Sequence, residues 1–210
     1  MTQAIALASK KIIGFMDTVE KLCHVKRYTL MQNGENERDS DHIMKLSFLA
    51  MMIAPYLKKP LDTAKMFELV LVHDLVEADA GDVPVFDQMK NPDLKAEKKK
   101  RELAAIERYR AMLPAPLGDK VYDLFMEYEK KETFEARLVR ALDKFEGNIQ
   151  CNKENFGARY YAQALTPVMN AMKSHKFSGS LDEEVISAIE TELVSRCEKN
   201  IEHCRKKGLI

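Results

Sequence analysis

Apolar residues recur at helical spacing along most of this chain, and few residues interrupt them. The clearest example is the stripe formed by Phe134, Leu138, Ala141, Leu142, Phe145 and Ile149, which falls on one side of a helix. Only 8 Gly and 7 Pro occur among the 210 residues. Short strands separated by turns would need more Gly, Asn and Pro than this. The pattern therefore predicts an all-α protein.

The same periodicity divides the chain into helices joined by short connections. Helices are predicted over residues 4–24, 40–57, 62–80, 94–112, 117–130, 132–155, 158–173 and 182–205. Residues 26–39 show no clear periodicity and are predicted to form a loop. No internal repeat and no long linker interrupts the series. We therefore expect a single compact helical domain over residues 1–210, with C-terminal helices over about 156–210.

The net charge and the cysteine spacing limit which binding partners and which cell compartment we expect. The 33 basic residues balance 33 acidic residues. Proteins that bind nucleic acid or anionic membranes usually carry an excess of basic residues. The charged run 95–102 reads as a solvated helix face. The four cysteines form no CxxC pair, and no stretch resembles a signal peptide or a spanning helix. We expect a cytoplasmic protein with no nucleic-acid partner and no membrane partner.

An ionisable pair, His73-Asp74, interrupts the most apolar stretch of the chain, residues 69–76. Burying such groups without partners costs free energy. One interpretation is structural, with His73 bonded to a backbone carbonyl and Asp74 paired with a lysine. The other is a divalent metal ion, because His and Asp are good ligands and a metal compensates the buried charge. On a continuous helix Glu77 shares a face with His73.

His42 and Asp143 help to decide between the structural interpretation and the metal site. His42 is in register with the apolar residues of its helix, which predicts that it points into the core. Asp143 lies well off the apolar stripe of its helix, which predicts a position on the flank, in a salt bridge with a neighbouring cation. Spacing alone therefore favours His42 with His73 and Asp74 as a metal set, and adds Asp143 only weakly.

The order of these residues along the chain resembles a known family. His42, then His73-Asp74, then Asp143, on separate helices, is similar to the pattern of the HD-domain metal-dependent phosphohydrolases. The segment 27–33 before His42, and the HDxxExxxGD pattern from His73 to Asp82, resemble the 5′-deoxynucleotidase branch of that family. The resemblance covers about residues 10–155, and residues 156–210 carry no motif.

The resemblance implies a metal site and a water-activating group. Carried over by position, it implies one divalent transition metal ion (Mn, Co, Fe, Ni or Zn) held by His42, His73, Asp74 and Asp143. Glu77 would then orient or deprotonate the attacking water, with Asp74 as the second catalytic carboxylate. A metal lowers the pKa of water toward 7 and supplies charge to phosphoryl oxygens, so this residue set suits phosphoester hydrolysis.

The resemblance also implies substrate contacts. Arg27 matches a position that meets the substrate near its sugar and phosphate, Asp82 matches one that faces the sugar, and Tyr28 matches one that contacts the base or the sugar. An arginine offers paired donors to a phosphate group. Tyr28 stands where relatives carry Trp, and Val85 and Phe86 stand where relatives place residues that can touch phosphate. These departures concern the identity of the substrate more than the class of reaction.

Three functions follow from this reading. The favoured one is a phosphomonoesterase that converts (deoxy)nucleoside 5′-monophosphates to nucleoside and phosphate, acting as a homodimer as relatives often do. The alternative is an HD-type hydrolase of another phosphoester, such as a nucleoside polyphosphate or a signalling nucleotide. The third is a helical binding module without turnover. Glu77 argues against the module, because binding alone needs no water-activating carboxylate.

Overall fold

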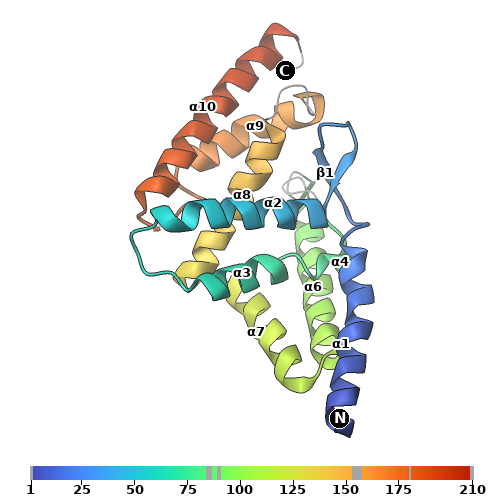
Figure 1. Ribbon diagram of the computed structural model, residues 1–210. Coiled ribbons are helices and arrows are strands. Elements are labelled where there is room, and N and C mark those ends of the chain that lie inside the picture. The colour runs from blue at the N-terminus through green and yellow to red at the C-terminus, as the bar shows by residue number, and fades with distance from the viewer. Residues whose placement is uncertain (1, 84–86, 89–90, 153–157, 180, 209–210) are drawn as a thin grey trace.

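The computed structural model describes residues 2–83, 87–88, 91–152, 158–179 and 181–208. Figure 1 shows helices arranged around one central helix, with the N-terminus and the C-terminus at opposite ends of the molecule. The elements are α1 (Gln3–Lys21), β1 (Lys26–Leu30), β2 (Asn36–Arg38), α2 (Asp39–Ile53), the 3₁₀ helix η1 (Ala54–Tyr56), α3 (Thr63–Val72), α4 (Glu77–Ala80), α6 (Pro92–Met112), α7 (Ala115–Lys130), α8 (Phe134–Cys151), α9 (Ala158–Lys173) and α10 (Glu184–Lys206). The all-α prediction is confirmed.

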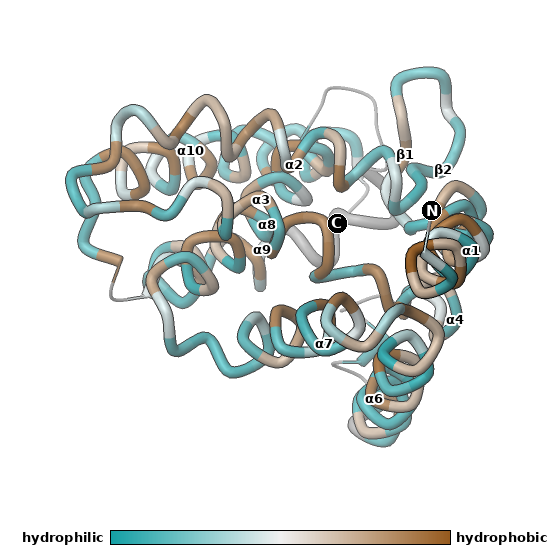
Figure 2. Tube along the Cα trace, turned by 60° about the horizontal axis from the view of Figure 1, so that its bottom comes forward, coloured by the Kyte–Doolittle hydropathy of each residue, from teal (hydrophilic) through white to brown (hydrophobic). Residues whose placement is uncertain are grey.

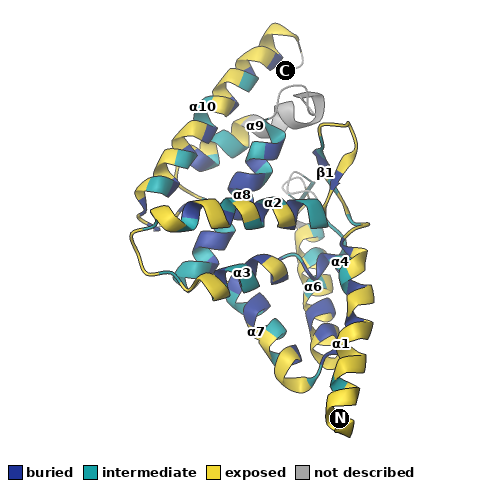
Figure 3. Cartoon of the chain, viewed as in Figure 1, coloured by how far each residue is buried: buried dark blue, intermediate teal, exposed yellow. Residues whose placement is uncertain are grey.

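Helix α8 is the centre of this arrangement. It packs against α2, α3, α7, α10 and β1, and most of its residues are buried in Figure 3, whereas α1 and α10 expose much of their surface. The predicted apolar stripe of α8 lies in the core. In Figure 2, α6 at the periphery is mostly hydrophilic. Because α8 has neighbours on several sides, its flanks are buried as well as its apolar stripe.

The buried apolar side chains form a cluster that extends from Phe15 on α1 to Cys204 on α10. This continuity supports the expectation of a single domain over residues 1–210, which stays a prediction. No helix in the described part of the chain is long and apolar enough to cross a membrane.

The segment 26–39 was expected to be a loop, and this expectation is wrong. Strands β1 and β2 pair antiparallel, with Lys26 opposite Arg38 and Leu30 opposite Asn36. Gly34, at φ +83°, lies in the turn between them. The hairpin escapes periodicity analysis because both strands are short and polar, so no apolar alternation marks them.

The helix expected over residues 62–80 is also interrupted. Its N-cap is Asp62, as predicted, whose side chain accepts from the amide of Lys65, but α3 ends at Val72 and α4 begins only at Glu77. Between them the amides of residues 75 and 77 donate to carbonyls three residues earlier rather than four. The tighter turn lies at the His73-Asp74 pair and interrupts the α-helical hydrogen-bond pattern there.

Other predicted helices differ by a few residues from those observed. Gly81 follows α4 with φ +73°, as expected of a residue after a helix, although its ψ of 151° is not that of a left-handed helical turn. A side chain here would be strained. The predicted end of the helix near residue 155, the residue Pro84, and the positions Val85 and Phe86 lie outside the described residues.

Candidate metal centre

His42 lies on the first turns of α2 and is fully buried, as its register with the core residues predicted. Its Nδ1 lies 2.5 Å from Oε2 of Glu146 on α8. Its Nε2 is buried and makes no hydrogen bond, and it lies 3.4 Å from Oδ1 of Asp143. Burial and Arg27 lower the pKa of His42, but the carboxylates of Asp143 and Glu146 raise it to about 9.

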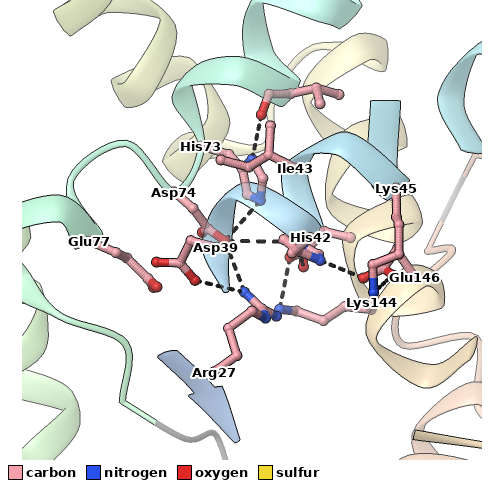
Figure 4. Close-up of polar contacts among 12 residues, drawn as sticks. Arg27, Asp39, His42, Ile43, Lys45, His73, Asp74, Glu77, Lys144 and Glu146 are labelled. Carbon is pink, nitrogen blue, oxygen red and sulfur yellow. Dashed lines mark hydrogen bonds and ion pairs between the residues drawn. The ribbon is translucent and has the colours of Figure 1, made fainter. Parts of the chain in front are cut away.

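His73 comes from the opposite side, at the C-terminal end of α3 (Figure 4). Its Nδ1 donates to the carbonyl of Val70 at 2.8 Å, which leaves Nε2 buried without a hydrogen bond. That Nε2 lies 3.1 Å from Oδ2 of Asp74. The rings of His42 and His73 are 5.5 Å apart between centroids. The structural alternative for His73, a bond to a backbone carbonyl, is therefore present, but it satisfies only one of the two ring nitrogens.

Asp143 is buried, with only 5% of its surface exposed. The prediction that it lies on an exposed flank is therefore wrong. The reason is that α7 covers this side of α8, where Tyr128 donates its hydroxyl hydrogen to Asp143 Oδ2 at 3.0 Å. Lys144, at 2.8 Å from the same oxygen, forms the neighbouring salt bridge that was expected. Burial raises the pKa of Asp143, but Lys144 and His42 hold it well below its usual range.

His42, His73 and Asp143 bring their ligand atoms close enough together to share one metal ion. One ligand atom from each of His42, His73 and Asp143 lies within 4.8 Å of the others. Both histidines are bonded on the outer nitrogen and unpaired on the inner one, which is the arrangement of metal-bound histidines with oriented outer partners. Two buried imidazole nitrogens without hydrogen bonds would otherwise cost free energy. The donor set therefore fits a divalent transition metal.

Asp74 joins this cluster to a second group of carboxylates. Its Oδ2 lies 3.1 Å from His73 Nε2, 3.8 Å from His42 Nε2 and 3.2 Å from a guanidinium nitrogen of Arg27. Burial raises the pKa of Asp74, but His73 and Arg27 lower it far below its ordinary value. One oxygen from each of Asp39, Asp74 and Glu77 lies within 4.8 Å of the others. Asp74 thus faces both groups.

Arg27 is a cation that contacts two of these carboxylates, Asp39 and Asp74. It lies on β1, not in a loop, and its side chain is 17% exposed. Its guanidinium is 3.3 Å from Glu37, 3.5 Å from Asp39 and 3.2 Å from Asp74, and Figure 4 shows it below the carboxylates. Burial lowers the pKa of Arg27, but the carboxylates, led by Asp74, raise it well above its ordinary value.

Glu77, the first residue of α4, is 3% exposed and turned toward the carboxylates (Figure 4). Its Oε1 accepts a hydrogen bond from Lys98 at 2.7 Å, and its Oε2 is buried without a hydrogen bond. Burial and Asp74 raise the pKa of Glu77 well above its ordinary value, against the effect of Lys98. A carboxylate with one anchored and one free oxygen is suited to accept a proton.

The other two residues expected to contact the substrate, Asp82 and Tyr28, differ in how far they are buried. Asp82 is partly buried, and its pKa is raised by burial against the effects of Arg27 and Lys98, so it lies near the same charges. Tyr28 is 46% exposed. On β1 its neighbours Arg27 and Thr29 are the more buried residues, so strand alternation turns Tyr28 to the other face. Asp82 is therefore partly buried, whereas Tyr28 lies on the more exposed face of β1.

Three further residues belong to this site and were not expected from the sequence. Glu146 lies four residues after Leu142 and three before Ile149, so a charge on the apolar stripe was a signal that could have identified it. Asp39 is fully buried, and neither of its carboxylate oxygens makes a hydrogen bond; burial and Asp74 raise its pKa to about 7.

The third is Lys98, whose side chain is only 16% exposed. The run 95–102 was expected to be solvated throughout, which is wrong for Lys98 and for Glu102, both partly buried. A sequence signal was available, because Lys98 and Glu102 are in helical register with Ala105 and Tyr109, which are buried on the same face of α6.

The fold and these residues agree with a known family. The model of the HD domain family matches residues 19–180, and this chain belongs to that family. The resemblance inferred from the motifs is thereby confirmed.

Within the family the chain is similar to proteins described as 5′-deoxynucleotidases. It is 34% identical to 5′-deoxynucleotidase HDDC2 of Xenopus laevis over 145 residues, which are 68% of this chain and 69% of that protein. It is 30% identical to 5′-deoxynucleotidase HDDC2 of Homo sapiens over 149 residues, 69% of each chain.

Solved structures show the same fold at lower identity. A predicted metal-dependent phosphohydrolase from Magnetospirillum magnetotacticum MS-1 superimposes with a TM-score of 0.75 at 22% identity, covering 92% of this chain and 96% of that one. The PH0347 protein from Pyrococcus horikoshii OT3 gives a TM-score of 0.61 at 22% identity, covering 86% of this chain and 99% of that one.

Proposed function

We propose that this chain is a metal-dependent phosphomonoesterase that hydrolyses (deoxy)nucleoside 5′-monophosphates to nucleoside and phosphate. The observation that carries the proposal is the pair of buried, unbonded imidazole nitrogens of His42 and His73 beside Asp143. A short distance away, Glu77 keeps one buried oxygen free. The names of the related 5′-deoxynucleotidases supply the class of substrate.

His42, His73 and Asp143, together with Asp74, would hold one divalent transition metal ion of the series Mn, Co, Fe, Ni and Zn. When bound, such an ion supplies positive charge to the phosphoryl oxygens and makes water more acidic. The protein contributes orientation. Glu146 and the carbonyl of residue 70 fix which ring nitrogen of each histidine faces inward.

Glu77 takes the proton of the attacking water at Oε2, the oxygen that makes no hydrogen bond. The water oxygen forms a bond to phosphorus, and the bond between phosphorus and the 5′ oxygen of the sugar breaks. The departing oxygen takes up a proton and leaves as the hydroxyl of the nucleoside. General-base assistance of this kind contributes about 10²- to 10⁴-fold to the rate.

Arg27 binds the phosphate in this proposal. Its guanidinium already lies against Asp74, and its planar fork can pair with two phosphate oxygens. Asp82 faces the sugar. A contact from Tyr28 would need the nucleotide to extend past the edge of β1, and it stays a prediction.

Two measurements on the purified protein test the proposal together. Elemental analysis should find a divalent transition metal. A phosphate-release panel of nucleoside mono-, di- and triphosphates should show release from the 5′-monophosphates. Release from triphosphates alone, or turnover that is unchanged after the metal is removed with a chelator, would contradict it.

We also propose that the protein forms a homodimer and is located in the cytoplasm. Large apolar side chains are half exposed along α2, at Met44, Phe48, Met51 and Met52, and a second copy of the chain could cover them. Sedimentation equilibrium that finds only monomer at micromolar concentration would contradict the dimer.

A further inference from the structure

Lys98 reaches from α6 into the carboxylate group of the site. Its Nζ lies 2.7 Å from Oε1 of Glu77 on α4 and 3.1 Å from Oε1 of Glu102, one turn further along α6. The side chains of Lys98 and Glu102 are each 16% exposed, and that of Glu77 is 4% exposed. Pairs this well buried are less screened by solvent than surface pairs.

The contact distinguishes the two oxygens of Glu77. Oε1 is bonded to Lys98, and Oε2 is buried and unbonded. One carboxylate oxygen of Glu77 lies within 4.8 Å of oxygens of Asp39 and Asp74. Three carboxylates this close repel one another, so Glu77 would turn away from them unless a cation held it. Lys98 is the cation that bonds to it.

Glu102 fixes Lys98 in turn. A lysine side chain is flexible and its ammonium could bond to many acceptors. Here it lies between two carboxylates that belong to different helices, and α4 and α6 pack directly against each other. The second carboxylate therefore holds the ammonium beside Glu77.

We propose that Lys98, held by Glu102, is a positioning residue that anchors Oε1 of Glu77 and thereby presents Oε2 to the attacking water. This rests on the proposed function, because it assigns Lys98 its effect through the water-activating carboxylate. It also excludes a direct contact between Lys98 and the phosphate of the substrate.

The test is a double-mutant cycle between Lys98 and Glu77. Lys98→Met keeps the length of the side chain and removes its charge. We expect kcat to fall about 10²-fold, as for a misplaced catalytic group, with KM changed little. In the Glu77→Gln background Lys98→Met should cause little further loss, because both changes remove the same contribution. Lys100→Met, at an exposed position on the same helix, should leave kcat and KM unchanged.

Two further variants separate positioning from folding. Lys98→Arg keeps the charge and should recover part of kcat. Glu102→Gln keeps the Lys98–Glu77 pair and should lower kcat relative to the wild type with KM changed little, so it tests the proposal if Lys98→Met fails to fold; an unchanged kcat would show that Glu102 does not hold Lys98. Equal losses from Lys98→Met in both backgrounds, or a raised KM at unchanged kcat, would overturn the proposal in favour of a direct phosphate contact.

A crystal structure of Lys98→Met decides the point without any activity. The proposal expects the Glu77 carboxylate to leave the position it holds in a wild-type crystal structure. An unmoved Glu77 would overturn it. If the wild type releases no phosphate from any nucleotide, the proposed function fails on that result, and the crystal structure still tests the role of Lys98.

Discussion

The two halves of the candidate site are built in different ways. The histidine side, His42, His73 and Asp143, takes its outer bonds from the helices that form the core: Glu146 on α8, the carbonyl of Val70 on α3 and the hydroxyl of Tyr128 on α7. The carboxylate side, Asp39, Asp74 and Glu77, is balanced by cations from outer elements, β1 and α6. The first is part of the core packing, and the second depends on peripheral elements.

This difference predicts that metal binding and catalytic turnover depend on different residues. On the histidine side two inward ring nitrogens make no hydrogen bond, so they are available to a cation. On the carboxylate side, oxygens of Asp39 and Glu77 make no hydrogen bond, so they are available to protons or hydrogen-bond donors. Changes to His42, His73 or Asp143 should therefore remove metal. Changes to Asp39 or Glu77, which are not among the proposed ligands, should lower the rate or substrate binding and leave metal in place.

The largest effect is expected from Asp143→Ala. It removes a ligand atom from the histidine side and leaves His42 and His73 facing each other without their carboxylate. Phosphate release should fall to the level of a reaction without enzyme, even with excess metal. Thermal unfolding and circular dichroism should show that the fold remains. Full activity at excess metal would show that Asp143 is not needed at the centre.

The next effect is expected from Glu77→Gln. Glutamine keeps the size and one acceptor oxygen but cannot take a proton. The value of kcat at saturating metal and substrate should fall by about 10²- to 10⁴-fold, or roughly 3 to 5 kcal/mol of barrier. If Glu77 only neutralises nearby charge, excess metal should instead restore the rate. Turnover near that of the wild type would rule out its role as a base.

Glu146→Gln should have a smaller effect, and the effect should be on metal affinity rather than on kcat. The amide can still accept from His42 Nδ1, but it lacks the charge that raises the basicity of the ring. Loss of such an outer partner typically costs about 10- to 100-fold in metal affinity or activity. Competition with a chelator measures the affinity. An unchanged affinity would mean that the histidine side does not depend on its outer bond.

Arg27→Lys should have the smallest effect, on stability. The guanidinium contacts Glu37, Asp39 and Asp74, and a single ammonium cannot reach all three. We expect the free energy of unfolding to fall by about 1 kcal/mol, measured by urea denaturation. Arg38→Lys is the matched control, since Arg38 is exposed and pairs with one aspartate. Equal stability of the two variants would contradict the role of Arg27 as the shared cation.

The same contrast explains what the sequence could predict. The inward direction of His42 follows from its register with the apolar residues of its helix, and the His73-Asp74 pair stands out because it interrupts an apolar stretch, so both are visible without a structure. Asp143 is the exception, because periodicity marks only the main core face and α8 is covered on its flank by α7. The family resemblance, not the pattern, identified it.

The carboxylate side could be predicted only in part. Arg27 was placed in a loop because short polar strands carry no periodicity, and Lys98 was assigned to a solvated face because it lies in a run of like residues. Both contacts join residues far apart in the sequence, Arg27 with Asp74 and Lys98 with Glu77. Lys98 is nevertheless in helical register with the buried Ala105 and Tyr109 and could have been found. Glu146 likewise lay on the apolar stripe and could have been found.

The most direct test of the separation between the two sides is the bound metal of Asp143→Asn and Glu77→Gln, measured side by side. Both variants nearly preserve side-chain volume and each removes one carboxylate charge. After loading with the same metal and dialysis, elemental analysis should find metal in Glu77→Gln at the level of the wild type and little in Asp143→Asn. Equal retention or equal loss in the two variants would contradict the account.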